Sequence, residues 1–110
     1  MQTKVTITML REMGTFREGI NAFKRVFPDG AEITLKNCLK AAKHNLCIYE
    51  FAHHYFPSPY LEAYKKAIEP YEEVFETAIE PHLHWEVYIK ALALTFWEIY
   101  QQYERKLNGR

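Results

Sequence analysis

The chain has 110 residues, of which 48% are hydrophobic and 15% aromatic, and its formal net charge is zero. This length favours one domain, 1–110, and the apolar content excludes a disordered chain. No uninterrupted apolar run approaches the roughly twenty residues of a membrane span, and the first residues lack the pattern of a signal peptide. The sequence therefore predicts a cytoplasmic protein in which Cys38 and Cys47 are reduced.

The charges are divided between two parts of the chain. Residues 1–45 hold eight Lys or Arg and four Asp or Glu, whereas residues 59–81 hold six Glu and two Lys, so the two segments carry +4 and −4. One interpretation is that the two segments simply face one another or are solvated. Alternatively, the acidic segment forms a helical face that binds a basic partner. The candidate acidic face consists of Glu62, Glu69, Glu73 and Glu80.

Short helices are predicted in the first part, residues 1–57. Thr6 or Thr8 can cap a first helix, which Gly14 ends. In the next segment the apolar positions step by four, three and four, which places them on one helical face. These positions are Phe16, Ile20, Phe23 and Phe27. The turn chemistry of residues 28–30 ends this second helix.

A third helix is expected from Thr34, which can serve as its N-cap, to Asn45, which suits the left-handed position after a helix. Its predicted buried stripe is Leu35, Cys38, Leu39 and Ala42. The segment 46–56 is a fourth helical stretch, because its apolar residues also recur at helical spacing. Two residues within 31–34 could form a strand, but no partner strand is evident, so an essentially all-α fold is predicted.

An eleven-residue repeat begins at Pro59. Residues 59–69 and 70–80 match at six of eleven positions, and a stretched third copy starts at Pro81. Eleven residues make almost three helical turns, so equivalent side chains return to nearly the same face. The predicted stripe consists of Tyr60, Tyr64, Ala67, Tyr71, Phe75 and Ala78, and it continues through His82, Trp85, Ile89, Leu92, Phe96, Ile99 and Tyr103.

The prolines of the repeat argue against one continuous helix. An interior proline removes a backbone hydrogen bond and costs about 3 kcal/mol, and this applies to Pro70 and Pro81. Pro59 avoids the cost if Ser58 is the N-cap, since proline is tolerated in the first turn. We therefore expect a helix that is kinked at Pro70 and broken or sharply bent near Pro81.

Such a break would give two arms of similar length, 59–80 and 82–107, which can pack as an antiparallel pair. The second arm contains the segment 91–100, which is apolar around most of its circumference and must be buried centrally or lie in an interface. The predicted fold is all-α, with short N-terminal helices packed on a long C-terminal helical hairpin or kinked long helix. A protruding arm that is buried in a second copy or in a partner is the alternative.

No metal or catalytic site is predicted. His53 and His54 are adjacent, and His82 and His84 are two residues apart, so neither pair shares a helical face. Zinc needs three or four convergent ligands. The glutamates of the repeat lie beside lysines and away from the aromatic stripe, as a solvated face would, and no phosphate loop or activated nucleophile is evident. The protein is therefore expected to be no enzyme and to use no cofactor.

The aromatic stripe has two interpretations. Aromatic side chains at helical spacing usually pack against neighbouring helices, but Tyr and Trp also anchor protein contacts. In the second case the stripe would bind a protein partner or a second copy of the chain. The candidate interface residues are Tyr60, Tyr64, Tyr71, Phe75, Trp85 and Trp97.

Several features follow one another along the chain: Leu10 and Gly14, the FPDG turn at 27–30, Thr34 with Cys38 and Ala42, and the repeat units that start at Pro59 and Pro70. In this combination the chain resembles small helical proteins of phages and prophages. These features are structural and transfer no catalytic residue. The resemblance implies an accessory protein of the host cytoplasm that binds and modulates a host protein, such as a component of a bacterial defence system.

Two other functions remain open at the level of the sequence. One is a self-associating structural protein, either a homodimer or a component of an assembly. The other is a nucleic-acid-binding module that uses the basic residues of the first half, although the zero net charge disfavours it. These basic residues are Lys24, Arg25, Lys36, Lys40 and Lys43.

Overall fold

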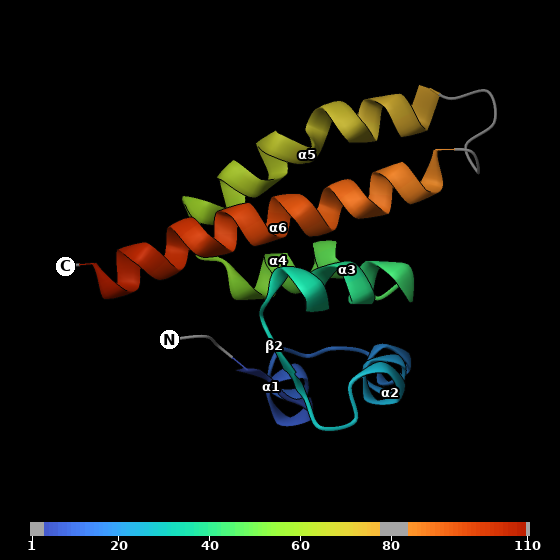
Figure 1. The fold of residues 1–110 in the computed structure, drawn as a ribbon, viewed down its shortest axis with the longest axis vertical. Helices are drawn as coiled ribbons and strands as arrows, with labels where there is room; N and C mark the ends of the chain where they lie inside the picture. The colour runs from blue at the N-terminus through green and yellow to red at the C-terminus, as the bar shows by residue number, and fades with distance from the viewer. Residues whose placement is uncertain (1–3, 78–83, 110) are drawn as a thin grey trace.

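The computed structural model describes residues 4–77 and 84–109, and three quarters of these residues are helical. The helices of this part of the chain are α1 (Ile7–Glu12), α2 (Arg17–Val26), α3 (Leu35–Lys43), α4 (Ile48–Tyr55), α5 (Tyr60–Thr77) and α6 (Trp85–Asn108). Two short strands, β1 (Lys4–Val5) and β2 (Ala31–Glu32), accompany them. The predicted helical fold with a long C-terminal hairpin is confirmed (Figure 1).

The elements form layers in Figure 1, with α1 and α2 at the bottom, α3 and α4 above them, then α6, and α5 at the top. α1, α2 and the strand pair form the lowest layer, which is called the N-terminal layer below. α3 and α4 lie above it and contact α6, and α5 runs antiparallel alongside α6. Because α3, α4 and α5 all pack on α6, this helix is the centre of the molecule. None of the helices within 4–77 and 84–109 has the length and apolarity needed to cross a membrane.

The predicted caps of the short helices are confirmed. The Thr6 hydroxyl accepts a hydrogen bond from the Met9 amide at 3.2 Å, and the Thr34 hydroxyl accepts one from the Asn37 amide at 3.1 Å. Each bond satisfies an amide of the first helical turn that has no partner within the helix. Asn45 follows α3 with a φ of 59°, as expected for its left-handed position.

The strand pair corrects the prediction that no partner strand exists for residues 31–34. β2 pairs antiparallel with β1, in a register that sets Lys4 opposite Glu32 and Val5 opposite Ala31. Gly30 allows this approach: its φ is 86°, and a Cβ at this position would lie 2.9 Å from the Val5 carbonyl oxygen. The pairing joins segments that are far apart in the chain, so no local pattern reveals it.

Two residues of the predicted N-terminal stripes are not buried. Phe16 precedes the first residue of α2 with extended backbone angles, and it is 73% exposed. It lies outside the helix, so the helical phase that predicts its burial does not apply to it. Leu35 is the first residue of α3 and is also exposed. The other members of the two stripes are buried or half-buried, as predicted. They are Ile20, Phe23 and Phe27 in the first stripe and Cys38, Leu39 and Ala42 in the second.

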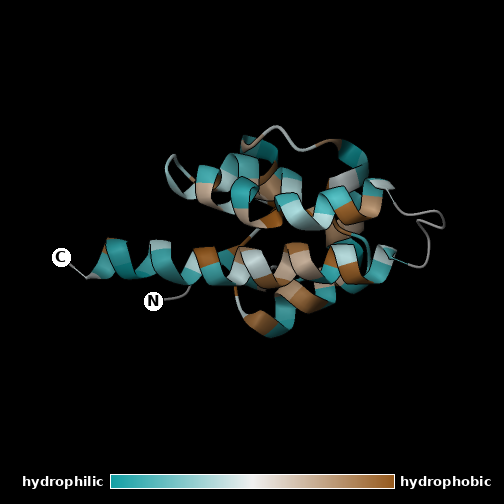
Figure 2. Ribbon diagram, turned by 90° about the horizontal axis from the view of Figure 1, so that it is seen from above, coloured by the Kyte–Doolittle hydropathy of each residue, from teal (hydrophilic) through white to brown (hydrophobic). Residues whose placement is uncertain are grey.

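One face of the segment 91–100 of α6 is buried at the centre, as expected, whereas Leu94 and Glu98 of this segment are exposed. Leu92, Phe96 and Ile99 are each less than one tenth exposed. The Phe96 ring lies 4.9 Å from the Phe56 ring and 5.7 Å from the Phe51 ring, measured between centroids. The last turns of α6, which lead to the C-terminus, are hydrophilic (Figure 2).

The prolines occupy different places. Pro70 lies inside α5, which remains one helix from Tyr60 to Thr77. The helix begins one residue after Pro59, whose carbonyl oxygen accepts from the Ala63 amide at 3.0 Å. Pro59 therefore holds the N-cap position that the prediction gave to Ser58. Pro81 lies outside the described residues.

Replacing Pro70 by alanine is expected to raise the free energy of unfolding by about 2 kcal/mol. The substitution removes the cost of an interior proline, about 3 kcal/mol, and it makes the unfolded chain more flexible, which returns up to about 1 kcal/mol. Urea unfolding followed by circular dichroism measures the change. The exposed neighbour Glu69, replaced by alanine, is the control and should change stability little. A lower stability of the Pro70→Ala variant would mean that α5 needs the proline in order to fit α6.

Candidate functional site

The six candidate interface residues do not lie on one surface. Tyr64 is fully buried, Tyr60 and Trp97 are half-buried against the core, and Phe75 is half-buried. Tyr71 and Trp85 are exposed. The structure therefore divides the aromatic stripe into a core part and a surface part, and both interpretations of the stripe apply to different residues.

Tyr64 belongs to the core. Its hydroxyl donates a hydrogen bond to the Leu92 carbonyl of α6 at 3.3 Å, and its ring lies 6.1 Å from the Phe56 ring of the segment that follows α4. Burial raises the pKa of this phenol above its ordinary value, and the nearby Tyr88, Cys47, Tyr49 and Glu72 act in the same direction. A phenol that is held this way joins α5 to α6 and is closed to a partner.

The buried face of α5 also differs from the predicted stripe. The prediction placed Ala67 and Tyr71 on it, but both are exposed, and Ile68 is fully buried instead. Residues three and four positions after a helical residue both lie near its face, so Ala67 and Ile68 are alternative neighbours of the buried Tyr64. The larger apolar side chain takes the inner position because its burial removes more apolar surface from water.

A ring cluster joins the two arms at the end of the hairpin. The Phe75 and Tyr88 rings are stacked, with centroids 5.0 Å apart and an interplanar angle of 11°, and the Trp85 ring lies 5.6 Å from Phe75. The Trp85 indole N–H donates to the Asn45 side-chain oxygen at 3.1 Å. The cluster thus holds α5, α6 and the segment after α3 in fixed positions.

The Tyr88 phenol lies in an electrostatically perturbed position within this cluster. Burial raises the pKa of Tyr88, and the negative charge of Glu72 and its hydrogen bond with Tyr88 raise the pKa further. Each of these effects disfavours the phenolate. The interaction adds a polar link between α5 and α6 next to the stacked rings.

Four exposed apolar side chains belong to the ring cluster or lie close to it in the chain, and they are called the hairpin-end surface below. They are Tyr71 (44% exposed), Val74 (55%), Trp85 (41%) and Val87 (60%). Each lies within four residues of Phe75 or Tyr88 in the chain. Most of the large exposed apolar side chains of residues 4–77 and 84–109 are these four and Leu94, so exposure is concentrated on the hairpin.

The predicted acidic face accompanies the hairpin-end surface. Glu62, Glu69 and Glu73 are exposed, as expected for a solvated face, and Glu80 lies outside the described residues. Lys65 Nζ lies 3.9 Å from a carboxylate oxygen of Glu62, so the first turn of α5 is partly neutralised. Residues 67–77 contain Glu69, Glu72, Glu73 and Glu76 and no Lys or Arg, so the acidic charge is concentrated next to the exposed apolar residues.

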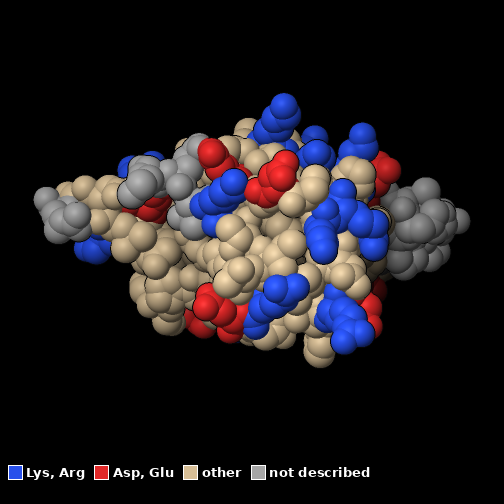
Figure 3. All heavy atoms as spheres, turned by 90° about the horizontal axis from the view of Figure 1, so that it is seen from below, with Lys and Arg blue, Asp and Glu red and all other residues tan. Residues whose placement is uncertain are grey.

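The basic residues of the first half are all exposed and are called the basic face below; they are Lys24, Arg25, Lys36, Lys40 and Lys43. In the view from below, Lys and Arg side chains predominate on the half of the molecule that contains α2 (Figure 3). Lys40 Nζ lies 5.3 Å from the centre of the Phe27 ring and covers it.

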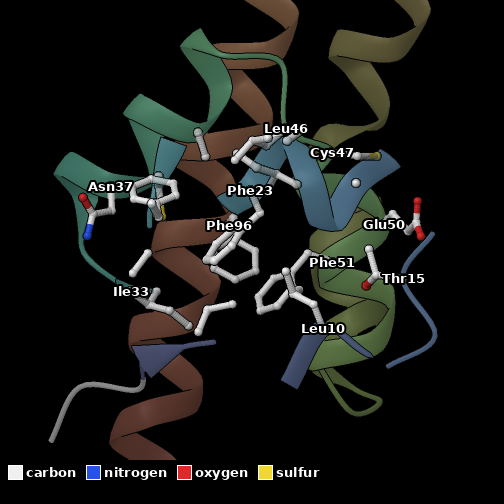
Figure 4. Close-up of a pocket in the computed structure, with 18 of the residues that line it drawn as sticks. Leu10, Thr15, Phe23, Ile33, Asn37, Leu46, Cys47, Glu50, Phe51 and Phe96 are labelled. Carbon is white, nitrogen blue, oxygen red and sulfur yellow. The ribbon is translucent and has the colours of Figure 1, made fainter. Parts of the chain in front are cut away.

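A cavity of about 350 Å³ lies between the N-terminal layer and the helices above it (Figure 4). The side chains of Phe51, Phe96 and Leu10 gather at its centre, whereas Asn37 and Glu50 lie at opposite margins. No local pattern of the sequence indicates this cavity. Both strands, the helices α1, α2, α3 and α4, and α6 contribute residues to its lining. Within each segment, the apolar residues of the lining have the spacing of ordinary core residues.

The histidines and cysteines form no metal cluster within the described part of the chain. His53 contacts the Tyr49 ring at 4.4 Å, and its buried Nε2 atom has no hydrogen-bond partner. Cys38 is buried and Cys47 is exposed, so the two thiols lie in different environments. Burial raises the pKa of the Cys38 thiol from 9.0 to about 11, which keeps it protonated and unreactive at neutral pH.

The described residues therefore offer two places at which a partner or ligand can bind, the hairpin-end surface and the cavity. They share no residue, but they adjoin, because Asn45 of the cavity lining accepts the hydrogen bond that Trp85 of the hairpin-end surface donates. Comparison of the chain with protein-family models, with curated proteins and with solved structures finds no match in any of the three.

Proposed function

We propose that the protein is a non-enzymatic interaction protein that binds another protein through the hairpin-end surface. The observation that carries the proposal is the exposure of Tyr71, Val74, Trp85 and Val87, which belong to a packed ring cluster or lie close to it in the chain. Tyr and Trp are frequent anchors of protein contacts. Because the rings of Phe75 and Tyr88 hold the two arms together, the surface is already ordered, which lowers the entropy cost of binding.

The chemistry of the surface defines the partner. The apolar side chains lie beside the four glutamates of residues 67–77, and no Lys or Arg of that segment neutralises them. A complementary partner would present an apolar centre with Lys or Arg at its rim. Such charge complementarity accelerates association and selects against acidic partners.

The class of partner is inferred from the resemblance to small phage and prophage proteins alone. That resemblance favours a host protein as the partner, and an inhibitor of a bacterial defence system as the biological role. The proposal would then place the protein in the cytoplasm of the host cell. It requires no catalytic residue, cofactor or metal of this chain.

The test is affinity capture from a bacterial lysate with matched variants. The wild-type chain should retain a specific basic protein, and Val74→Lys should lose it, because a charge replaces an exposed apolar contact. Leu107→Lys is the control, since Leu107 is a comparably exposed aliphatic residue in the last turns of α6. Equal circular dichroism spectra would show that neither variant unfolds. Capture of nothing, or equal capture by both variants, would contradict the proposal.

Self-association is the second candidate function, and the basic face is the observation that favours it. A second copy could place this face against the acidic hairpin end of the first, which would be a head-to-tail contact. Light scattering tests self-association. A monomeric mass at all concentrations would exclude it, whereas a larger mass that the Val74→Lys substitution reduces would support it. The basic face could also serve nucleic-acid binding, and failure to bind short duplexes at low salt would exclude that function.

A further inference from the structure

The cavity is large enough for a small organic molecule. Its volume of about 350 Å³ is more than twice the roughly 150 Å³ of an engineered protein cavity that takes up benzene. It also lies at the lower end of the range of about 300–1,000 Å³ that is typical of ligand pockets. Native cores are packed to the density of organic crystals and leave few voids above the size of water. The exposed residues in its lining show that this cavity is instead a pocket open to solvent between the layers.

The lining selects a neutral ligand. The central side chains are apolar, and the buried residues that line the cavity are aliphatic or aromatic apart from the thiol of Cys38. The polar groups at the margins are partly engaged: the Asn37 amide donates to the Glu32 carbonyl at 2.8 Å, and the Asn45 oxygen accepts from Trp85. An ion that entered the centre would lose its hydration without gaining a partner, which costs several kcal/mol.

The lining also favours an aromatic ligand. Four phenylalanines contribute to it, namely Phe23, Phe27, Phe51 and Phe96. They form two tilted pairs, with ring centroids 5.3 Å apart for Phe23 and Phe27 and 5.7 Å apart for Phe51 and Phe96. An aromatic guest between such pairs gains edge and face contacts, worth about 0.5–1.5 kcal/mol each beyond the burial of its surface.

The exposed residues of the lining indicate the entrance. They include Glu18 and Gly19 from α2 on one side and Asn45, Cys47 and His54 from the segment 45–54 on the other. Figure 4 places Cys47, Thr15 and Glu50 on the same side of the cavity. α1 and α2 contact each other more than they contact any other helix.

We propose that this cavity binds a neutral, largely aromatic small molecule of about two fused rings, which enters between α2 and the segment 45–54. The proposal does not rest on the proposed function or on the identity of any protein partner. A ligand bound there would join the N-terminal layer to α3, α4 and α6. It would therefore stabilise the chain by binding only its folded form.

Naphthalene is the probe for the first test. Nuclear magnetic resonance of the methyl groups should show saturable shifts at Leu10, Ile33 and Leu46, whereas the methyl groups of Val74 and Val87 should not respond. Naphthoate, which carries the same rings and a charge, should bind at least about tenfold more weakly because its carboxylate loses hydration. Unchanged methyl signals up to the solubility limit of naphthalene would overturn the proposal, and so would equal binding of naphthoate.

Filling the cavity gives a matched pair of variants. Ala41 lines the cavity, so Ala41→Leu should weaken naphthalene binding at least about tenfold while the chain stays folded. Ala63→Leu makes the same chemical change at an exposed position of α5 and should bind as the wild type does. Ala22→Leu fills the cavity from α2 and replaces Ala41→Leu if that variant does not fold. Binding that is equal in the filled and control variants would place naphthalene elsewhere and overturn the proposal.

The entrance is tested through Cys47, which is exposed, whereas Cys38 is buried and protonated. A bulky maleimide should therefore react with Cys47 and slow the uptake of naphthalene. Cys47→Ser, treated with the same reagent, should take up naphthalene at the rate of the untreated protein. An unchanged uptake rate in the labelled protein would contradict the entrance between α2 and the segment 45–54.

Discussion

Replacing Tyr64 by alanine is expected to lower the free energy of unfolding by about 3–5 kcal/mol, a large part of the stability of a domain of this size. The Tyr64 side chain is fully buried and packs beside the Phe56 and Phe96 rings at centroid distances of 6.1 and 6.3 Å. Alanine would leave a void between α5, α6 and the segment after α4 that these rigid helices cannot fill. Urea unfolding followed by circular dichroism measures the loss.

Two further variants separate the contributions at this position. Tyr64→Phe keeps the ring and removes only the hydroxyl that donates to Leu92, so it should cost about 1 kcal/mol. Tyr71→Ala is the control, because the same residue type is truncated on the same helix at an exposed position. Its cost should stay below about 1 kcal/mol. Equal losses for Tyr64→Ala and Tyr71→Ala would mean that α5 presents a different face to α6.

The comparison of these tyrosines shows what an eleven-residue repeat can predict. The repeat sets the phase of the helix, and with the prolines it correctly predicts two arms that pack together. It does not decide whether Ala67 or Ile68 faces inward, because both are compatible with the same phase. That choice depends on the opposing surface of α6, where Tyr64 meets the Leu92 carbonyl.

Local chemistry was predictable, whereas two of the features that join distant segments were not. The capping roles of Thr6 and Thr34 follow from residue type and position, because a cap bonds only to its own first turn. The pairing of β1 with β2 joins two residues near the start of the chain to two that follow Gly30. The cavity likewise arises from several segments at once, so none of them carries a signal of it.

Alkaline pH is expected to destabilise the protein through its buried acids. Burial raises the pKa of Cys38 from 9.0 to about 11, and it raises the pKa of Tyr64 above its ordinary value of 10.0. Each group has its ordinary pKa in the unfolded chain and a raised pKa in the folded chain. At a pH between these two values, the unfolded chain has lost the proton that the folded chain keeps. The free energy of unfolding therefore falls by about 1.4 kcal/mol per pH unit for each group in its window. Burial and Glu72 shift the pKa of Tyr88 in the same direction.

Cys38 and Tyr64 lose their contributions to stability over different pH ranges, so variants of each residue can show which group causes the loss in each range. The contribution of Cys38 is complete below about pH 9 and is lost by about pH 11, a loss of roughly 3 kcal/mol, whereas that of Tyr64 begins to fall only above about pH 10. Urea midpoints are measured across this range, each relative to the same variant at about pH 8. From about pH 9 onward the midpoint of Cys38→Ala should fall less than that of the wild type. Tyr64→Phe should follow the wild type up to about pH 10 and decline less steeply above it. If the Cys38→Ala curve runs parallel to that of the wild type, the thiol ionises equally in the folded and unfolded states. That result would contradict the prediction, because the Cys38 side chain is buried in the folded state.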